Sequence, residues 1–247
     1  IKNAGDIFLS GKIDLVKIPD KPSSMAPYVL KPADTRMIFE QKNWFRVVGF
    51  HTRNVIHRGH EFIQMKALHD YHCDGLFVSP VIGPKKKNDF QSEIILNAYQ
   101  TMVDLNLYPK NKVLIGAFLT YSRFAGPREA IFTAICRKNF GCSHFVIGRD
   151  HAGVQDFYPP EGSSELFDKV GDIGISPIFF DEVAHCELCK APRLSCEHPE
   201  SNIRRISGTE VRQILLQGRK HPAWLLREEV STMLIEAMKS GKQILAT

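Results

Sequence analysis

Long apolar runs, blocks of like charge and repeated segments are all missing from this chain of 247 residues. No stretch of 18 or more residues is continuously apolar, so the sequence predicts no transmembrane helix and no membrane partner. The formal net charge of +5 has no long Lys/Arg block behind it, and an anionic small molecule explains it as well as a nucleic acid does. Hydrophobic residues make up 43% and charged residues 24%, which is ordinary for a globular protein.

Cysteine is sparse, with six residues, and its spacing does not resemble a disulfide framework. Three cysteines are scattered and three are clustered, at Cys186, Cys189 and Cys196, with His198 two residues further on. Four such ligands within 13 residues suit tetrahedral zinc and leave no position for a catalytic water, so we predict a structural Zn²⁺ site. Unmetallated cysteines in a Pro-rich loop are the alternative. Free thiols beside a metal site indicate a reducing compartment, and we expect the cytoplasm.

The most informative stretch is FRVVGFHTRNVIHRGH, residues 45–60. Its apolar run, turn and following helical pattern predict the first strand–loop–helix unit of a parallel α/β sheet. Ligands of such units bind at the carboxyl ends of the strands, and phosphates bind at helix N-termini. A bare His-x-x-His pair such as His57 and His60 is more often two surface or capping histidines. The preceding Thr52-Arg53-Asn54, at the end of the strand, favours a phosphate site instead.

Apolar runs predict further strands at 76–82, 113–119, 143–147 and 175–180, and helical patterns cover 32–41, 90–107, 206–217 and 228–238. The fold class that we expect is therefore α/β with a Rossmann-like parallel sheet. An Ile-Phe-Leu run and a Ser-Gly turn predict a β-hairpin within residues 1–18, and four prolines between 19 and 32 predict an extended linker. Because the chain begins with Ile1 rather than Met, we expect it to be a fragment of a longer protein.

Three other runs carry groups that suit phosphate binding. Gly148-Arg149-Asp150-His151-Ala152-Gly153 follows a predicted strand, and its two glycines let the backbone approach a phosphate while Arg149 supplies a guanidinium. Ser207 and Glu210 form a predicted capping box, which is a structural explanation by itself. The lysines of Gly83-Pro84-Lys85-Lys86-Lys87 are more simply a solvated surface, although they could also attract a polyphosphate.

Residues 52–60 resemble the signature of the ATP sulfurylases (sulfate adenylyltransferases), which reads Gln-Thr-Arg-Asn followed by His-x-x-His. The resemblance extends to Gly126-Pro127-Arg128-Glu129-Ala130, to the Gly-Arg-Asp-His-Ala-Gly run and to the Ser207-Gly-Thr209-x-x-Arg212 pattern, and it covers the chain from about Pro32 to its end. Some bacterial and archaeal members carry a comparable zinc loop. The sequence departs from the pattern at one position, because the glutamine of the family is His51 here.

This resemblance implies the conversion of ATP and sulfate to adenosine 5'-phosphosulfate and pyrophosphate, by in-line attack of sulfate on the α-phosphorus and without an enzyme nucleophile. It implies a homo-oligomer that does not bind nucleic acid, with Mg²⁺ arriving on the triphosphate. The implied catalytic residues are Thr52, Arg53, Asn54, His57 and His60. The implied sulfate-binding residues are His51, Arg53 and Ala152. The implied ATP-binding residues are His51, Thr52, Arg53, Asn54, His57, His60, Gly148, Arg149, Asp150, His151, Ser207 and Thr209.

The resemblance also implies a division of the chain into three parts. These are the end of an N-terminal β domain with its linker (1–31), a Rossmann-like adenylyltransferase domain (32–182), and a zinc loop with a C-terminal helical region (183–247).

The histidine at position 51 leaves two interpretations of the acceptor anion open. Either His51 binds the sulfate when its ring is protonated, which gives an acid-shifted optimum, or the acceptor is another anion. We favour the first interpretation. A zinc-containing nucleic-acid-binding module is the alternative from a different class, but the basic residues are not interleaved with aromatic residues as such a module requires.

Overall fold

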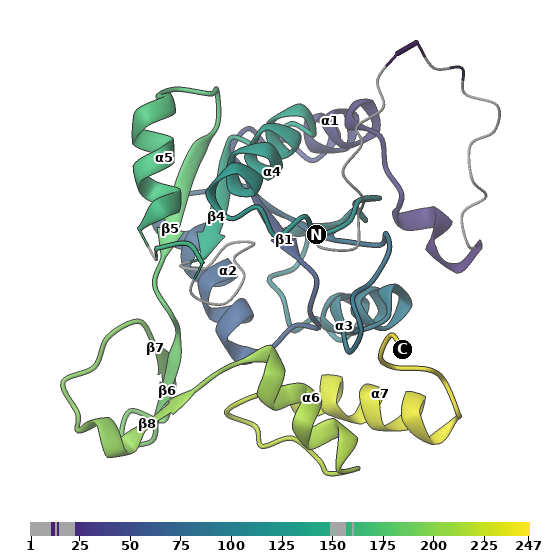
Figure 1. Cartoon of the computed structure of the whole chain (residues 1–247), viewed down its shortest axis with the longest axis vertical. Helices are drawn as coiled ribbons and strands as arrows, with labels where there is room; N and C mark the ends of the chain where they lie inside the picture. The colour runs from purple at the N-terminus through teal and green to yellow at the C-terminus, as the bar shows by residue number, and fades with distance from the viewer. Residues whose placement is uncertain (1–10, 13, 15–22, 149–156, 160) are drawn as a thin grey trace.

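The computed structural model describes residues 11, 12, 14, 23–148, 157–159 and 161–247 (Figure 1). The hairpin predicted within residues 1–18 lies almost wholly outside this part of the chain. Arg149, Asp150, His151 and Ala152 lie outside it as well.

The central element is a five-stranded parallel sheet in the order β3-β2-β1-β4-β5. Its strands are β1 (Val47–Thr52), β2 (Gly75–Pro80), β3 (Val113–Ile115), β4 (His144–Gly148) and β5 (Ser176–Phe180). Strand β1 pairs with β2 on one side and with β4 on the other, so the direction of the crossovers changes between β1 and β4. Ligands of doubly wound sheets bind at this switch point, outside the carboxyl ends of the strands. The structure therefore confirms the predicted Rossmann-like α/β fold.

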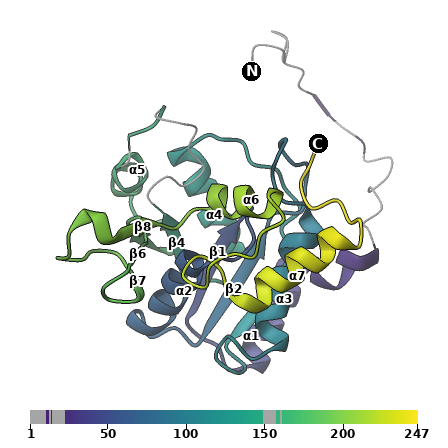
Figure 2. The ribbon, with the colours of Figure 1, turned by 90° about the horizontal axis from the view of Figure 1, so that it is seen from below.

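Helices cover both faces of the sheet, and each face has its own apolar core (Figure 2). One core joins Val48 and Phe50 of β1 to α2 (Arg58–Asp70), α3 (Ser92–Asp104), α6 (Gly208–Leu216) and α7 (Glu228–Lys239). The other core joins Val47 of β1 to α1 (Pro32–Gln41), α4 (Pro127–Asn139) and α5 (Gly162–Val170). Because neighbouring residues of a strand face opposite sides, the continuous apolar run of β1 fills both cores.

A small antiparallel sheet lies beside this domain, in the order β7-β6-β8. It consists of β6 (Ala184–Cys186), β7 (Ala191–Arg193) and β8 (Ile203–Arg205), with the 3₁₀-helix η2 (Glu200–Asn202) leading into β8. Figure 1 shows it at the lower left, reached from β5 and continuing into α6. Strands of three residues with few apolar side chains are too short to stand alone.

Two segments differ from the expectation drawn from the sequence. Within the predicted extended linker, residues 23–28 form the 3₁₀-helix η1 (Ser23–Tyr28). Tyr28 fixes it to the sheet edge, because its hydroxyl donates to Gln100 Oε1 (3.0 Å) and its carbonyl accepts from the Ala117 N–H (2.7 Å). Helix α5 was not predicted, since its Gly-Ser-Ser start shows no apolar period.

The end of the chain pairs with the loop that follows β2. After α7, Phe90 and Leu245 form an antiparallel bridge. The N–H groups of Asn88 and Gln91 donate to the Ala246 and Ile244 carbonyls (both 2.8 Å), and the Ala246 N–H donates to the Asp89 carbonyl (2.8 Å). We call residues 244–246 the tail strand. Among the helices of the described residues, none combines the length and the apolar character needed to cross a membrane.

Candidate active site

The loop that follows β1 is shaped by its own threonine. The Asn54 N–H donates to Thr52 Oγ1 (3.1 Å), and the Thr52 carbonyl accepts from the Val81 N–H (2.9 Å). Thr52 is buried and only 4% exposed, so its hydroxyl holds a tight turn at the carboxyl edge of the sheet. The turn directs Arg53 and Asn54 away from the strand, and the chain then enters α2.

His57 and His60 lie together at the start of α2. His57 is the N-cap, and its Nδ1 accepts from the His60 N–H (3.2 Å), which places the remaining ring proton of a neutral His57 on Nε2. The two rings stack with centroids 3.7 Å apart. Burial lowers the pKa of His57 well below its usual value, and the neighbouring His60 lowers it further. Burial lowers the pKa of His60 to about 4. Both rings are therefore neutral at pH 7.

A pocket of about 230 Å³ opens beside these two rings, and we call it the histidine pocket. It lies between the start of α2, the end of β4 and the segments that flank the small sheet. Its lining residues are His57, Gly59, His60, Ile63, Gly148, Asp181, Glu182, Val183, Arg205 and Ile206. The predicted residues His57, His60 and Gly148 thus share one cavity, at the switch point of the sheet.

A second pocket, of about 360 Å³, lies on the other side of the loop and contains Arg53. We call it the lysine pocket, because Lys85 and Lys86 line it with Asp89, Phe124 and neighbouring residues. Arg53 Nη1 lies 3.7 Å from Asp89 Oδ2, and the guanidinium lies over the Phe124 ring at 4.8 Å. Burial lowers the pKa of Lys85 to about 8, against the opposing effect of Asp89. The pocket gathers three cations around one carboxylate, which suits a polyanion.

The start of α6 reaches the same loop from the far end of the chain. Ser207 caps the helix, since its hydroxyl accepts from the Glu210 N–H (3.2 Å). Arg212 donates to Asn54 Oδ1 (3.2 Å) and to Thr209 Oγ1 (3.0 Å). The predicted residues Ser207 and Thr209 therefore lie next to Asn54, at a helix N-terminus with exposed N–H groups.

His51 precedes this loop and is bonded to a buried arginine of α4. Arg137 Nη2 lies 2.9 Å from His51 Nδ1. Because arginine only donates, Nδ1 accepts this bond and the ring proton is on Nε2. The geometry favours a neutral ring over the doubly protonated ring expected from the sequence.

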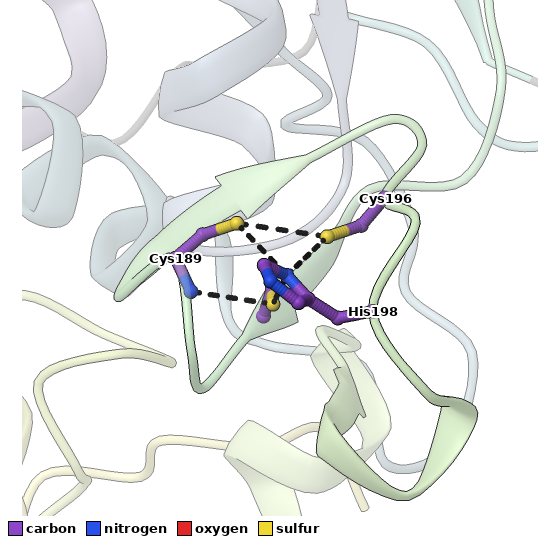
Figure 3. Close-up of side chains that lie close together, drawn as sticks. Cys189, Cys196 and His198 are labelled. Carbon is purple, nitrogen blue, oxygen red and sulfur yellow. Dashed lines mark hydrogen bonds between the residues drawn. The ribbon is translucent and has the colours of Figure 1, made fainter.

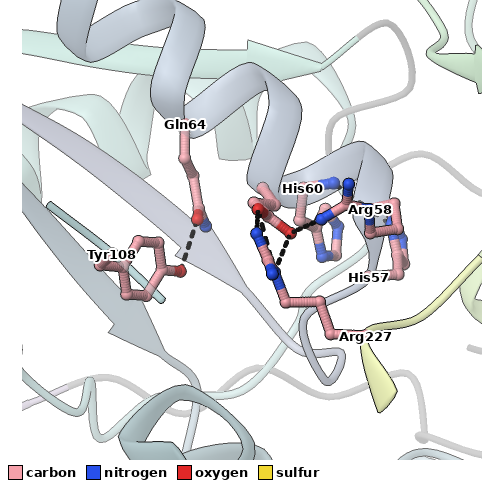
Figure 4. A network of polar contacts seen from close by, with 7 residues as sticks. His57, Arg58, His60, Gln64, Tyr108 and Arg227 are labelled. Carbon is pink, nitrogen blue, oxygen red and sulfur yellow. Dashed lines mark hydrogen bonds and ion pairs between the residues drawn. The ribbon is translucent and has the colours of Figure 1, made fainter. Parts of the chain in front are cut away.

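A charged network fixes α2 to the segment before α7 (Figure 4). Glu61 accepts from Arg58 Nη1 (2.8 Å), and both of its oxygens accept from Arg227, with Arg227 Nη2 2.6 Å from Oε1. On the next turn of α2, Gln64 Oε1 accepts from the buried Tyr108 hydroxyl (2.7 Å). The helix that carries both histidines is therefore bonded to the start of α7 and to Tyr108.

Three cysteines and a histidine converge within the small sheet (Figure 3). Their ligand atoms all lie within 4.8 Å of one another. The Cys189–Cys196 Sγ distance is 3.6 Å, and His198 Nδ1 lies 3.4 Å from the Sγ atoms of Cys186 and Cys189 and 3.1 Å from that of Cys196. Tetrahedral zinc requires edges of about 3.8 Å between two sulfurs and about 3.6 Å between sulfur and nitrogen. The donor set and its spacing fit this metal.

The small sheet that carries this cluster also reaches the histidine pocket. Val183 precedes β6 and Arg205 ends β8, and both residues line the pocket. Cys186 is the last residue of β6 and is fully buried. A metal at this cluster would therefore hold together the two strands whose ends form one wall of the pocket.

Sequence reasoning did not find four residues that support the site: Asp89, Phe124, Glu61 and Arg137. A signal for Arg137 was present, because Ala130, Ala134 and Arg137 follow the i, i+4, i+7 spacing of one buried face. Asp89 lies near Arg53 only because the chain folds, and no local sequence pattern indicates this contact.

A family model described as ATP-sulfurylase matches residues 26–237 of this chain. The chain belongs to the ATP-sulfurylase family. Curated members of the family resemble it over nearly its whole length. The sulfate adenylyltransferase of Ignicoccus hospitalis is 43% identical over 235 residues, which are 94% of this chain and 60% of that protein. Those of Pyrococcus abyssi and Symbiobacterium thermophilum are 42% and 40% identical, covering 93% and 96% of this chain and 60% of each relative. The chain thus spans about three fifths of the length of these ATP-sulfurylase relatives.

The fold agrees with a solved structure as well. A chain described as a hexameric APS kinase from Thiobacillus denitrificans superposes with a TM-score of 0.70 at 19% identity, covering 91% of this chain and 42% of that chain. At this identity the likeness concerns the fold alone, and it supports the Rossmann-like architecture of this ATP-sulfurylase chain.

Proposed function

We propose that the protein is a sulfate adenylyltransferase, which transfers the adenylyl group of ATP to sulfate and releases pyrophosphate. The observation that carries the proposal is the convergence of Arg53, Asn54, His57, His60 and Gly148 at the switch point of the sheet, in a chain of the ATP-sulfurylase family. Sulfate attacks the α-phosphorus directly, and the bond to the leaving pyrophosphate breaks. The reaction therefore needs charge stabilisation and alignment rather than an enzyme nucleophile.

We assign the nucleotide to the histidine pocket and to the helix N-termini beside it. His57 and His60 are neutral, so the two rings line the phosphate site without bringing a buried charge of their own, and the donor assigned to the phosphates is the Nε2–H of His57. The N-terminal N–H groups of α2 and α6 favour negative charge at the same edge, and the hydroxyls of Ser207 and Thr209 add donors there. From the resemblance, we assign Arg149, Asp150 and His151 to the same nucleotide.

We assign the acceptor anion to Arg53 and His51, with the Ala152 N–H taken from the resemblance. Arg53 is suited to this role because Asp89 and Phe124 hold its guanidinium from two sides. A planar guanidinium held in this way gives two parallel donors to an oxyanion. Thr52 acts indirectly, since its hydroxyl shapes the turn that presents Arg53.

Two metal ions follow from this proposal. Mg²⁺ binds with the triphosphate of ATP and reduces its charge, without a dedicated protein cage. Zn²⁺ is held by Cys186, Cys189, Cys196 and His198 and is structural, because four protein ligands leave no open coordination position.

We also propose that the protein is a homo-oligomer that acts in the cytoplasm. All six cysteines lie in the described part of the chain, and none of them forms a disulfide bond, which suits a reducing compartment.

Pyrophosphate release from MgATP tests the function on the full-length protein. We expect release that depends on sulfate or molybdate and is absent with phosphate or without an anion. A His57→Ala variant should lose at least 100-fold in rate, because it removes a donor at the phosphates, on the order expected for such groups. His69→Ala, on the exposed end of the same helix, is the matched control. Release without any dependence on sulfate or molybdate would instead indicate a nucleotidyltransferase with another acceptor.

A further inference from the structure

Arg137 is the largest fully buried side chain that the structure describes. Its exposed fraction is 0%, and no carboxylate in the described part of the chain forms a salt bridge with it. Burial lowers the pKa of its guanidinium to about 10, so the group stays charged at neutral pH. An unpaired buried cation is costly, and an apolar side chain of similar shape would fill the same space at lower cost. The position therefore requires an explanation beyond packing.

The side chain of Arg137 extends from α4 across β1 to His51. A Cβ added at Gly49 would lie 3.2 Å from Arg137 Cγ, so the arginine stem crosses β1 where the strand has no side chain. Gly49 and His51 share one face of the strand, and the arginine head reaches His51 Nδ1 at 2.9 Å. The Phe118 ring lies 4.4 Å from the guanidinium and covers it. The two other guanidinium nitrogens, Nε and Nη1, have no hydrogen-bond partner among the residues that the structure describes.

The bond to Nδ1 determines what His51 can offer to a ligand. Since Arg137 can only donate, Nδ1 must accept, and the ring presents an N–H at Nε2. The opposite tautomer would present a lone pair at Nε2 and would direct its Nδ1–H at the guanidinium. A doubly protonated ring would direct the same Nδ1–H at it, with charge repulsion added.

We propose that Arg137 is a positioning residue, which fixes the tautomer of His51 so that Nε2–H donates to the acceptor oxyanion. This inference rests on the proposed function and concerns its substrate class. Sulfate and molybdate carry no proton at neutral pH and only accept hydrogen bonds, whereas hydrogen phosphate also has a hydroxyl that must donate. An imidazole that is fixed as a donor at Nε2 favours an anion that only accepts, and it offers nothing to the hydroxyl of hydrogen phosphate.

The substitution Arg137→Met tests this role, because methionine keeps an unbranched stem and removes the donor. We expect the KM for sulfate to rise about tenfold, the value of one hydrogen bond to an anion, while the KM for MgATP changes less than twofold. Discrimination between sulfate and phosphate should fall. The midpoint of thermal unfolding should stay the same or rise, since a buried unpaired charge is lost. Lys138→Met, the adjacent cation on α4, is the matched control and should leave the KM for sulfate unchanged.

A double-mutant cycle distinguishes a positioning role of Arg137 from a role in packing alone. In a His51→Ala background, Arg137→Met should add no further rise in the KM for sulfate, because the residue through which it acts is gone. The same rise in both backgrounds would contradict the proposal.

The tautomer can also be observed without any activity, by ¹⁵N resonances of labelled histidine at pH 7.5. We expect His51 Nδ1 to be unprotonated and Nε2 protonated in the wild type, and a mixture of tautomers in Arg137→Met. A protonated Nδ1 in the wild type, or an unchanged tautomer in the variant, would overturn the inference. The wild type could show this tautomer and still release no pyrophosphate in response to sulfate. In that case the proposed function is wrong, but Arg137 still fixes the tautomer of His51.

Discussion

His57 and His60 make the folded state sensitive to acid. An unfolded chain binds a proton at histidine with a pKa of 6.5, whereas burial lowers that of His60 in the folded chain to about 4. The unfolded state therefore binds more protons between these values, and stability is full above pH 6.5 and is lost as the pH falls toward 4. His60 alone contributes at most about 3 kcal/mol to this loss.

We therefore expect His60→Asn to flatten the dependence of the unfolding free energy on pH between 6.5 and 4. Denaturant unfolding at a series of pH values measures this slope. The control is His69→Asn on the same helix, whose imidazole is 88% exposed. Equal slopes in the two variants would show that the acid sensitivity comes from other groups.

Ser207 can be both a helix cap and a ligand for phosphate, because its hydroxyl accepts from the Glu210 N–H and still has a proton to donate. Ser207→Ala should cost about 1 kcal/mol of stability, and Ser207→Gly only a few tenths, since glycine is tolerated at N-caps. Both variants lack the hydroxyl, so both should raise the KM for MgATP by a similar factor of about five. A wild-type KM in the glycine variant would leave the cap as the only role of the residue.

At the scale of elements, we expect the small sheet to depend on a bound metal. Strands β6, β7 and β8 have three residues each, and the ligands Cys186, Cys189, Cys196 and His198 connect them. We expect one Zn²⁺ per chain by elemental analysis. Its removal by a chelator should expose residues 184–205 to proteolysis while the parallel sheet stays folded. Cys189→Ser should behave like the chelated protein, and Cys136→Ser, which lies outside the cluster, should not. A chelated protein with unchanged protease resistance would show that the small sheet needs no metal.

The sequence predicted the elements whose formation is determined by residues close together in the chain. Strand β1 and helix α1 were predicted because their apolar spacing and the proline at the start of α1 determine them. The strands of the small sheet were not predicted, because each has only three residues, which is too short for an apolar alternation to be seen. Arg137 was not predicted as part of the site, since an arginine in a helix is usually exposed and its partner His51 lies 86 positions away.

Two sets of assignments stay predictions. One is the division of the chain at residues 31 and 182, and the other is the set of roles proposed for Thr52, Arg53, Asn54, His57 and His60. Sequence patterns could indicate these residues because they are consecutive or evenly spaced. The arrangement around them, with Asp89 behind Arg53 and Arg212 across from Asn54, required the fold.

At the scale of the whole molecule, the tail strand connects the end of the chain to the lysine pocket. Residues 244–246 bond to Asn88, Asp89 and Gln91, and Asp89 in turn holds Arg53. Deleting residues 243–247 should therefore speed amide hydrogen exchange at Asn88 and Gln91 and raise the KM for sulfate severalfold. Substituting Leu245 by Val, which keeps the backbone pairing, is the control. An unchanged KM in the truncated protein would show that Arg53 does not depend on the tail.

The tail strand also sets an order of events during synthesis. The Arg53 loop is synthesised well before Ile244 and Ala246, which follow it in the sequence by about 190 residues. The parallel sheet can assemble while the chain is growing, since its final strand ends at Phe180. The backbone bonds that steady Asp89 cannot form until translation has passed residue 246. A nascent chain would thus complete its parallel sheet before the backbone bonds that steady Asp89, and with it Arg53, can form.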